Sequence, residues 1–210
     1  MADSVDVALI DYGAGNLRSV DNALRAVGAD VCVTADAEAV LRAGRIVLPG
    51  VGSFGACAQG LRAIPGMVEA LEQRVRRDGA PFLGICVGMQ LLATQGLEFG
   101  AVAGLDWIAG AVVKVEPGDD AVKVPHMGWN DVMLPQHRRV HPVIESGEAY
   151  FLHSYHFVPT DGTHIAALTE HGGPLVAAVA HENILGLQFH PEKSQRYGLS
   201  ILERFLEWAP

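Results

Sequence analysis

The sequence predicts an α/β protein with a mostly parallel sheet, flanking helices and an added antiparallel layer. In the first half, short apolar runs alternate with amphipathic helical patterns, an order that builds parallel strands joined by right-handed crossovers. In the second half, strand-like runs follow one another with turn signals between them. Half of the 210 residues are hydrophobic, which allows a large core and excludes a disordered chain. We see no linker, so we expect residues 1–210 to form a single domain.

The first half holds four expected strands, at residues 7–10, 31–33, 46–48 and 82–85. Helices are expected after the first strand, before the third and before the fourth. Apolar residues at helical spacing mark two of these helices: Leu17, Val20, Leu24 and Val27 in one, and Met67, Leu71 and Val75 in the other. Glycine-bearing loops follow the strands that end at Ile10, Leu48 and Ile85. Sites form at the carboxyl ends of parallel strands, so we expect these loops to cluster.

The second half has shorter strand candidates, at residues 112–115, 122–124, 132–134, 150–152, 165–168, 175–179 and 184–189. Gly172 and Gly173 separate two of them, which is a strong hairpin signal. The chain then ends with a helix, which has one apolar stripe: Leu199, Leu202, Phe205, Leu206 and Trp208. This half therefore predicts the antiparallel layer that is added to the parallel sheet.

Charge and cysteine content exclude several classes of protein. The net charge is −9 and basic residues form no long run, so nucleic acid and anionic membranes are poor partners. Acidic residues, glycine and proline interrupt every apolar stretch before it reaches membrane-spanning length. The three cysteines show no CxxC spacing, and their odd number without a signal peptide indicates a reducing cytoplasm. We expect a soluble, cytoplasmic protein.

Cys86 follows a buried strand and precedes a helix, in the run GICVGMQ at residues 84–90. A strand, a tight turn and a helix with a nucleophile at the turn form a nucleophile elbow. We expect the helix to begin just after Cys86 and to continue to Gln95, where Gly96 can cap it. Free N–H groups at the start of that helix favour a thiolate. The alternative is an ordinary core cysteine, which is our interpretation of Cys57 in the helix after residue 53.

His190 and Glu192 close the last expected strand, in the run QFHPEKS at residues 188–194. Residues two apart share a face of an extended chain, and Pro191 disfavours a helix at His190. A carboxylate beside an imidazole fixes its tautomer and stabilises its charged form. His190 could then take the proton of Cys86 and pass it to a leaving amine. Alone, the pair is better interpreted as a solvated His–Glu contact at a strand end. Together with the cysteine elbow and a glycine loop after a neighbouring strand, it indicates nucleophilic catalysis.

The run PGVGSF at residues 49–54 offers backbone N–H groups near the expected nucleophile. With the N–H of Val87, those of Val51 and Gly52 could form an oxyanion hole, in which each donor is often worth about 3–4 kcal/mol. A phosphate-binding loop is the rival interpretation. It lacks the Lys-Ser/Thr of a P-loop and the spacing is not GxGxxG.

These residues carry a resemblance to a known family. GICVGMQ around Cys86, with HPE at residues 190–192, resembles the class I (triad) glutamine amidotransferases along nearly the whole chain. The runs DYGAGN (11–16), PGVGSF (49–54) and PHMGWN (125–130) are similar to the glutaminase subunits of imidazole glycerol phosphate synthase within that family. The resemblance implies a flavodoxin-like sheet and a triad of Cys86, His190 and Glu192.

The resemblance also implies a reaction and a partner. Cys86 would attack the carboxamide of glutamine, release ammonia and form a γ-glutamyl thioester that water converts to glutamate. The ammonia would pass through a sheltered path to a (βα)₈ cyclase, which makes imidazole glycerol phosphate and aminoimidazole carboxamide ribotide in histidine biosynthesis. Neither a cofactor nor a metal is implied for this chain.

Further roles follow from matching positions. The resemblance places Gly52, Gln90, Ser154 and Tyr155 in the glutamine pocket. Glu98 matches less closely, because residues 91–97 depart from the family's usual phenylalanine and acidic cluster. The positions expected to face the cyclase are Asn16, Trp129 and Lys193. Trp129 could instead pack in the core, Asn16 could be a helix N-cap and Lys193 a surface charge.

Other functions stay open. The chain could supply ammonia to another synthase, such as that for pyridoxal phosphate, although the PHMGWN run argues against it. It could be a noncatalytic binding module, although it retains all three triad residues. A stand-alone cysteine hydrolase is a further alternative. A metal shared by His153 and His156 is not expected, because residues three apart face opposite sides of an extended chain.

Overall fold

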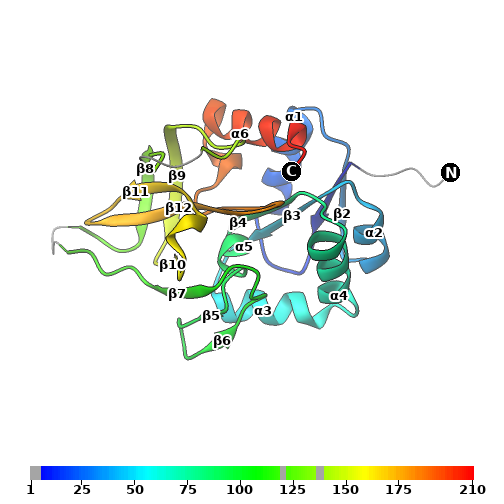
Figure 1. The fold of residues 1–210 in the computed structure, drawn as a ribbon, viewed down its shortest axis with the longest axis horizontal. Helices are drawn as coiled ribbons and strands as arrows, with labels where there is room; N and C mark the ends of the chain where they lie inside the picture. The colour runs from blue at the N-terminus through cyan, green and yellow to red at the C-terminus, as the bar shows by residue number, and fades with distance from the viewer. Residues whose placement is uncertain (1–5, 119–121, 136–139) are drawn as a thin grey trace.

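The computed structural model describes residues 6–118, 122–135 and 140–210, and a seven-stranded sheet forms its centre (Figure 1). Five strands are parallel in the order β2-β1-β3-β4-β13, the 2-1-3-4-5 order of flavodoxin-like folds. Their bounds are Val7–Ile10 (β1), Val31–Thr34 (β2), Arg45–Gly50 (β3), Phe82–Cys86 (β4) and Ile184–Leu187 (β13). Antiparallel β12 (Pro174–His181) and β11 (Ile165–Glu170) extend the sheet beyond β13. The fold class predicted from the sequence is confirmed.

Helices cover both faces of this sheet. α1 (Leu17–Ala26) and α6 (Gln195–Glu207) lie on one face, and α3 (Phe54–Ala63) and α4 (Met67–Leu71) on the other (Figure 1). The shorter helical segments are α2 (Ala37–Arg42), the π-helical η1 (Glu72–Arg77), α5 (Val87–Gln90), and the 3₁₀ turns η2 (Gly162–His164) and η3 (Pro191–Lys193). Within the described ranges, none of the helices combines the length and the apolar character that crossing a membrane requires.

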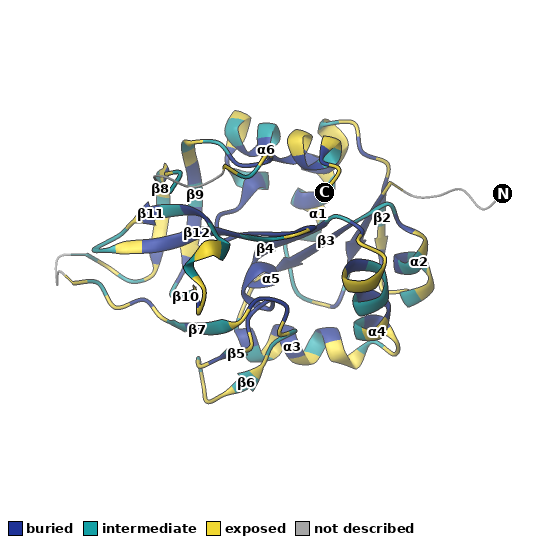
Figure 2. Ribbon diagram, in the orientation of Figure 1, coloured by how far each residue is buried: buried dark blue, intermediate teal, exposed yellow. Residues whose placement is uncertain are grey.

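The core lies between the sheet and these helices. Every residue of β1, β4 and β13 is buried, and Figure 2 shows the centre of the sheet in dark blue. Strands that are buried on both faces appear in the sequence as continuous apolar runs rather than as alternating ones. That is why the parallel strands could be located from short runs of Val, Ile and Leu.

Two smaller sheets stand beside the main one. In the first, β10 (Tyr155–Pro159) pairs with β7 (Gly110–Lys114), followed by β5 (Gln95–Gly96) and β6 (Val102–Ala103). In the second, β8 (His126–Val132) pairs with antiparallel β9 (Gly147–His153). The N–H of His190 donates to the carbonyl of Tyr150 over 2.9 Å, which ties β9 to the segment that follows β13. The small sheets therefore stand over the carboxyl ends of the parallel strands.

Three local predictions were wrong. The helix after Cys86 ends at Gln90 rather than Gln95, because Gln95–Gly96 forms strand β5. A Cβ on Gly96 would lie 2.4 Å from the ring of Phe54, so close packing on α3 and pairing with β6 and β7 override the helical propensity. Residues 122–124 form no strand, and the strand expected at 132–134 overlaps β8 only at Val132.

Candidate active site

Cys86 sits on a strained turn between β4 and α5. Its backbone has φ 54° and ψ −112°, a conformation that residues with a side chain rarely adopt. A Cβ on Gly84 would lie 2.6 Å from the carbonyl oxygen of Gly88, and one on Gly88 would lie 1.8 Å from that of Leu48. Only glycine fits at either position. The nucleophile elbow expected from GICVGMQ is therefore present in its geometry.

The sulfur of Cys86 is nearly enclosed, since the residue is only 4% exposed. Its Sγ lies 4.0 Å from the carbonyl oxygen of Leu152 and 3.8 Å from Nε2 of Gln188, which donates toward it. α5 is a single turn, so it offers the sulfur a few free N–H groups rather than the dipole of a long helix. The sequence had not singled out Gln188 or Leu152, and Leu152 contributes only a backbone atom.

His190 and Glu192 form a buried pair. Nδ1 of His190 lies 2.9 Å from Oε1 of Glu192, and the two side chains are 3% and 0% exposed. Burial lowers the pKa of His190, but hydrogen bonds to Cys86 and Glu192 outweigh it and raise the pKa to about 9. With Nδ1 facing the carboxylate, the imidazole has Nε2 left for the sulfur. The three side chains that the sequence grouped as a triad thus meet at one point.

The route by which His190 and Glu192 meet differs from the prediction. β13 ends at Leu187, and Pro191–Lys193 forms the 3₁₀ turn η3, so the pair does not share the face of a strand. Ser194, which sequence reasoning missed, fixes this turn. Its buried hydroxyl donates to the carbonyl of His190 over 2.7 Å and accepts the N–H of Tyr150 over 2.9 Å. A serine two residues after the His-Pro-Glu run was the only signal for this role.

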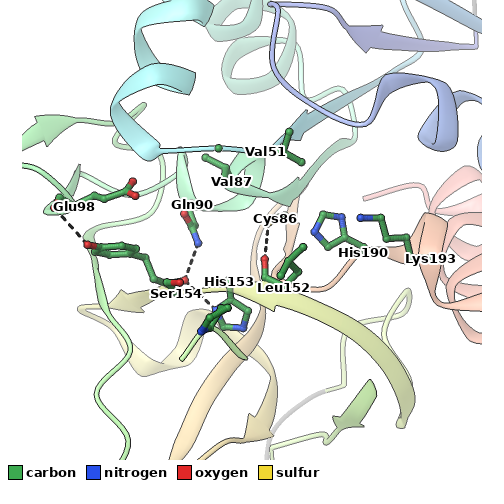
Figure 3. Close-up of a pocket in the computed structure, with 13 residues that line it drawn as sticks. Val51, Cys86, Val87, Gln90, Glu98, Leu152, His153, Ser154, His190 and Lys193 are labelled. Atoms are coloured by element: carbon green, nitrogen blue, oxygen red, sulfur yellow. Dashed lines mark hydrogen bonds between the residues drawn. The ribbon is translucent and has the colours of Figure 1, made fainter. Parts of the chain in front are cut away.

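A cavity of about 280 Å³ opens beside the sulfur (Figure 3). Most residues that the sequence assigned to catalysis, oxyanion binding and substrate binding line it: Val51, Gly52, Cys86, Val87, Gln90, Glu98, Ser154, Tyr155 and His190. Lys193, which was assigned to a partner interface, lines it as well. Pro125, Leu152 and His153 complete the lining without having been predicted. Glu192 lies outside the lining, against His190.

The PGVGSF segment runs along one side of this cavity. Gly50, the last residue of β3, pairs with Cys86 in the parallel register, which places Val51 and Gly52 beside the sulfur. Gly52 has φ +102°, which favours glycine. The carbonyl of Val51 accepts the thiol of Cys57 over 3.4 Å, and Cys57 is fully buried, as expected.

Gln90 and Glu98 line another part of the cavity (Figure 3), and Tyr155 joins them, since its hydroxyl donates to the backbone carbonyl of Glu98 over 3.4 Å. Nε2 of Gln90 donates to the carbonyl of Tyr155 over 2.9 Å and to Oε1 of Gln188 over 3.0 Å. Both N–H groups of the amide are used inside the protein, so its oxygen is the atom left for a ligand. Oε2 of Glu98 accepts the N–H of Phe54 over 2.8 Å, which holds that carboxylate at the start of α3.

Of the three residues predicted to face a partner, Lys193 lines the cavity, and Asn16 and Trp129 lie outside its lining. Trp129 on β8 is 43% exposed, so the core-packing alternative is wrong. Its ring meets Tyr150 edge-on at 6.2 Å, and Nζ of Lys193 lies 5.8 Å from the centre of the same Tyr150 ring. Asn16 occupies the N-cap position of α1, but its side chain makes no capping hydrogen bond. Trp129 and Lys193 thus share one neighbour.

Known proteins match this chain over nearly its full length. A model of the family "Glutamine amidotransferase class-I" matches residues 8–208. The imidazole glycerol phosphate synthase subunit HisH of Zymomonas mobilis is 60% identical over 210 residues, covering 99% of this chain and 98% of that protein. The subunit of the same name from Rhodospirillum rubrum is 51% identical, covering 97% and 99%.

Solved structures are similar in fold. One described as a glutamine amidotransferase superposes with a TM-score of 0.73 at 19% identity, covering 96% of this chain and 97% of that one. PurLQS from Thermotoga maritima gives a TM-score of 0.69 at 18% identity, covering 98% and 99%. At such identities the likeness concerns the arrangement of strands and helices alone.

Proposed function

The chain belongs to the class I glutamine amidotransferase family, in which it groups with the HisH glutaminase subunits of imidazole glycerol phosphate synthase, and we propose how its own residues hydrolyse glutamine. Cys86 is the nucleophile, His190 the acid and base, and Glu192 the group that orients His190. The observation that carries this assignment is the meeting of a strained, buried cysteine with a buried His–Glu pair at one cavity. Histidine biosynthesis is the pathway that the reaction serves.

The chemistry proceeds in two halves. Nε2 of His190 takes the proton of Cys86, whose sulfur attacks the carboxamide carbon of glutamine. The oxygen that becomes negative is held by backbone N–H groups of Val51, Gly52 and Val87. His190 returns the proton to the leaving nitrogen, which departs as ammonia, and a γ-glutamyl thioester remains. Water, deprotonated by His190, then attacks the thioester, and glutamate leaves as the thiol is restored.

The rest of the cavity fits the amino-acid part of glutamine. The carboxylate of Glu98 and the amide oxygen of Gln90 can accept hydrogen bonds from the α-ammonium group. Ser154 and Tyr155 also line the cavity, and the amide of Gln90 holds the backbone carbonyl of Tyr155. A charged acceptor and a neutral one at this end select a ligand with a free α-amino group.

Membership among HisH subunits implies a partner subunit, and we propose that it is a (βα)₈ cyclase docked on the cavity rim. Trp129, Asn16 and Lys193 are the contacts that we assign to it. Ammonia released into neutral water is mostly protonated and no longer nucleophilic, so a partner that covers the rim would preserve it. The exposed Trp129 and the Lys193–Tyr150 contact support this site.

Two further features of the chain complete the proposal. Residues 1–210 work as one amidotransferase domain, which the buried core running from β1 to α6 supports. We place the reaction in a reducing compartment, because Cys32, Cys57 and Cys86 are all free.

The test is glutamine turnover by this chain together with its partner subunit. Wild-type protein should release glutamate and ammonia in equal amounts, and Cys86→Ala should release neither at a measurable rate. Cys32→Ala is the matched control, because Cys32 lies on β2 and outside the cavity. Turnover that persisted in Cys86→Ala would refute the assignment of the nucleophile.

A further inference from the structure

Two buried hydrogen-bond donors lie behind the PGVGSF segment, and the mechanism above does not use them. The hydroxyl of Tyr12 donates to the carbonyl of Pro49 over 2.6 Å, and Tyr12 is 6% exposed. The thiol of Cys57 donates to the carbonyl of Val51 over 3.4 Å, and Cys57 is fully buried. The two donors come from different elements, the loop after β1 and helix α3. They bind alternate carbonyls of one segment.

Packing holds Tyr12 firmly against this segment. A Cβ on Gly50 would lie 2.8 Å from the Tyr12 hydroxyl and 2.7 Å from the nitrogen of Gly88, so Tyr12 and Gly88 leave no room for a side chain at this position. On the other side, a Cβ on Gly60 of α3 would lie 2.8 Å from the Tyr12 carbonyl oxygen. Cys57 and Gly60 are three residues apart on α3 and share a face. Tyr12 therefore fills the space between that face of α3 and the segment.

The hydrogen bond from Cys57 to the Val51 carbonyl also fixes the direction of the next N–H group, that of Gly52. In a planar trans peptide the carbonyl and the following N–H point in opposite directions. A carbonyl of Val51 that is directed at Cys57 therefore sends the N–H of Gly52 away from Cys57. Cys57 is buried outside the cavity and Gly52 lines it, so that N–H is directed toward the cavity side.

Building on the proposed glutamine hydrolysis, we propose that Tyr12 and Cys57 are positioning residues for the oxyanion hole. By binding the carbonyls of Pro49 and Val51, they hold the peptides on either side of the Gly50–Val51 unit. Glycine at positions 50 and 52 leaves this segment free to turn, so its orientation must be imposed from outside. The two donors impose it without touching glutamine.

The protonation state of both groups suits this role. Burial, and next the neighbouring Cys57, raise the pKa of the Tyr12 hydroxyl. Burial also raises the pKa of the Cys57 thiol, although the neighbouring Tyr12 hydroxyl lowers it in part. Both groups therefore keep their protons at neutral pH and remain donors. A neutral Cys57 also adds no negative charge beside a Cys86 thiolate.

The test measures steady-state glutaminase kinetics of Tyr12→Phe, Cys57→Ala and Cys57→Ser in the complex with the partner subunit. An oxyanion donor acts in the transition state, so kcat should fall with KM nearly unchanged. We expect a fall of about tenfold, less than the 10²–10³-fold for a donor removed outright. Cys57→Ser should recover most of kcat, because its hydroxyl can donate to the same carbonyl. Tyr197→Phe is the matched control, since the Tyr197 hydroxyl binds a backbone carbonyl at Glu145.

A second readout separates positioning from damage to the nucleophile. Alkylation of Cys86 by iodoacetamide is a direct displacement that needs no oxyanion hole, so its rate should stay at the wild-type value in Tyr12→Phe and Cys57→Ala. Unchanged kcat in both variants would overturn the proposal. The proposal would also be overturned if alkylation of Cys86 and glutamine turnover both fell. It would likewise be overturned if the kcat of Cys57→Ser were no higher than that of Cys57→Ala. Failure of the proposed function itself would appear separately, as turnover that survives Cys86→Ala.

Discussion

Nδ1 of His190 lies 2.9 Å from Oε1 of Glu192, and neither side chain is more than 3% exposed. Within the described residues, the second oxygen of that carboxylate is also buried and has no hydrogen-bond partner. The negative charge therefore has little to stabilise it except the imidazole, which in turn is favoured in its charged form. This contact decides both the tautomer of His190 and its pKa of about 9.

Replacing Glu192 by Gln should keep the shape of this pair and remove its charge. The pKa of His190 should then fall toward its ordinary value, because Glu192 is one of the two groups that raise it. We expect kcat to drop at least tenfold while KM changes little, since the imidazolium is needed only as the reaction proceeds. A pH–rate profile measures both effects. An unchanged profile would show that Glu192 does not tune His190.

The raised pKa of His190 also predicts how stability depends on pH. Its pKa is about 9 in the folded protein and 6.5 in the reference state, so folding favours the protonated form. The resulting stabilisation is fully present below about pH 6.5 and is lost as the pH rises through about 9. Urea unfolding of wild type and His190→Gln at pH 6 and pH 9.5 checks this. The difference in unfolding free energy between wild type and His190→Gln should be larger at pH 6 than at pH 9.5. An equal difference at the two pH values would contradict the raised pKa of His190.

Glu98 should bind the α-ammonium group of glutamine. Glu98→Gln removes the charge but can still accept the N–H of Phe54, so the loop should keep its place. Charge-assisted hydrogen bonds contribute about 1.5–3 kcal/mol, which predicts a rise in KM of roughly tenfold or more. The value of kcat should change much less. A fall in kcat with no change in KM would show that Glu98 does not bind the α-ammonium group of glutamine.

Trp129 should anchor the partner subunit. Buried tryptophans at interfaces often contribute about 2 kcal/mol or more, so Trp129→Ala should weaken binding about 30-fold. Titration calorimetry with the purified partner measures this. Val33→Ala is the matched control, because Val33 is also 43% exposed but lies on β2, at the edge of the sheet. Equal affinities for wild type and Trp129→Ala would place the interface elsewhere.

The sequence was most informative where structure depends on near neighbours. Cys86, Gly84 and Gly88 lie within five residues, and a Cβ on Gly84 would meet the carbonyl oxygen of Gly88 inside that same turn. Four of the five parallel strands were likewise visible as short apolar runs. The fifth, β13, was located but assigned to the antiparallel layer, whereas it pairs in parallel with β4. His190 and Glu192 were grouped correctly, although a 3₁₀ turn rather than a strand joins them.

What the sequence could not reveal depends on distant contacts. Gln95 and Gly96 leave the helix after Cys86 because they pair with Val112 and Ala103 and pack on Phe54. Leu152 reaches the sulfur through a carbonyl, which every residue has. Cys57 was correctly expected to be buried. Its hydrogen bond to Val51 spans only six residues, but it depends on how α3 follows the PGVGSF segment, which the residue types alone do not determine.

The central claim is that glutamine is hydrolysed through a covalent bond to the sulfur of Cys86. Mass spectrometry of the complex, quenched in acid during turnover of glutamine, tests it most directly. The account predicts a peptide containing residue 86 that is heavier by one γ-glutamyl group and loses that mass when treated with hydroxylamine. Steady release of ammonia with no adduct on residue 86, or with an adduct on Cys32 or Cys57, would contradict it.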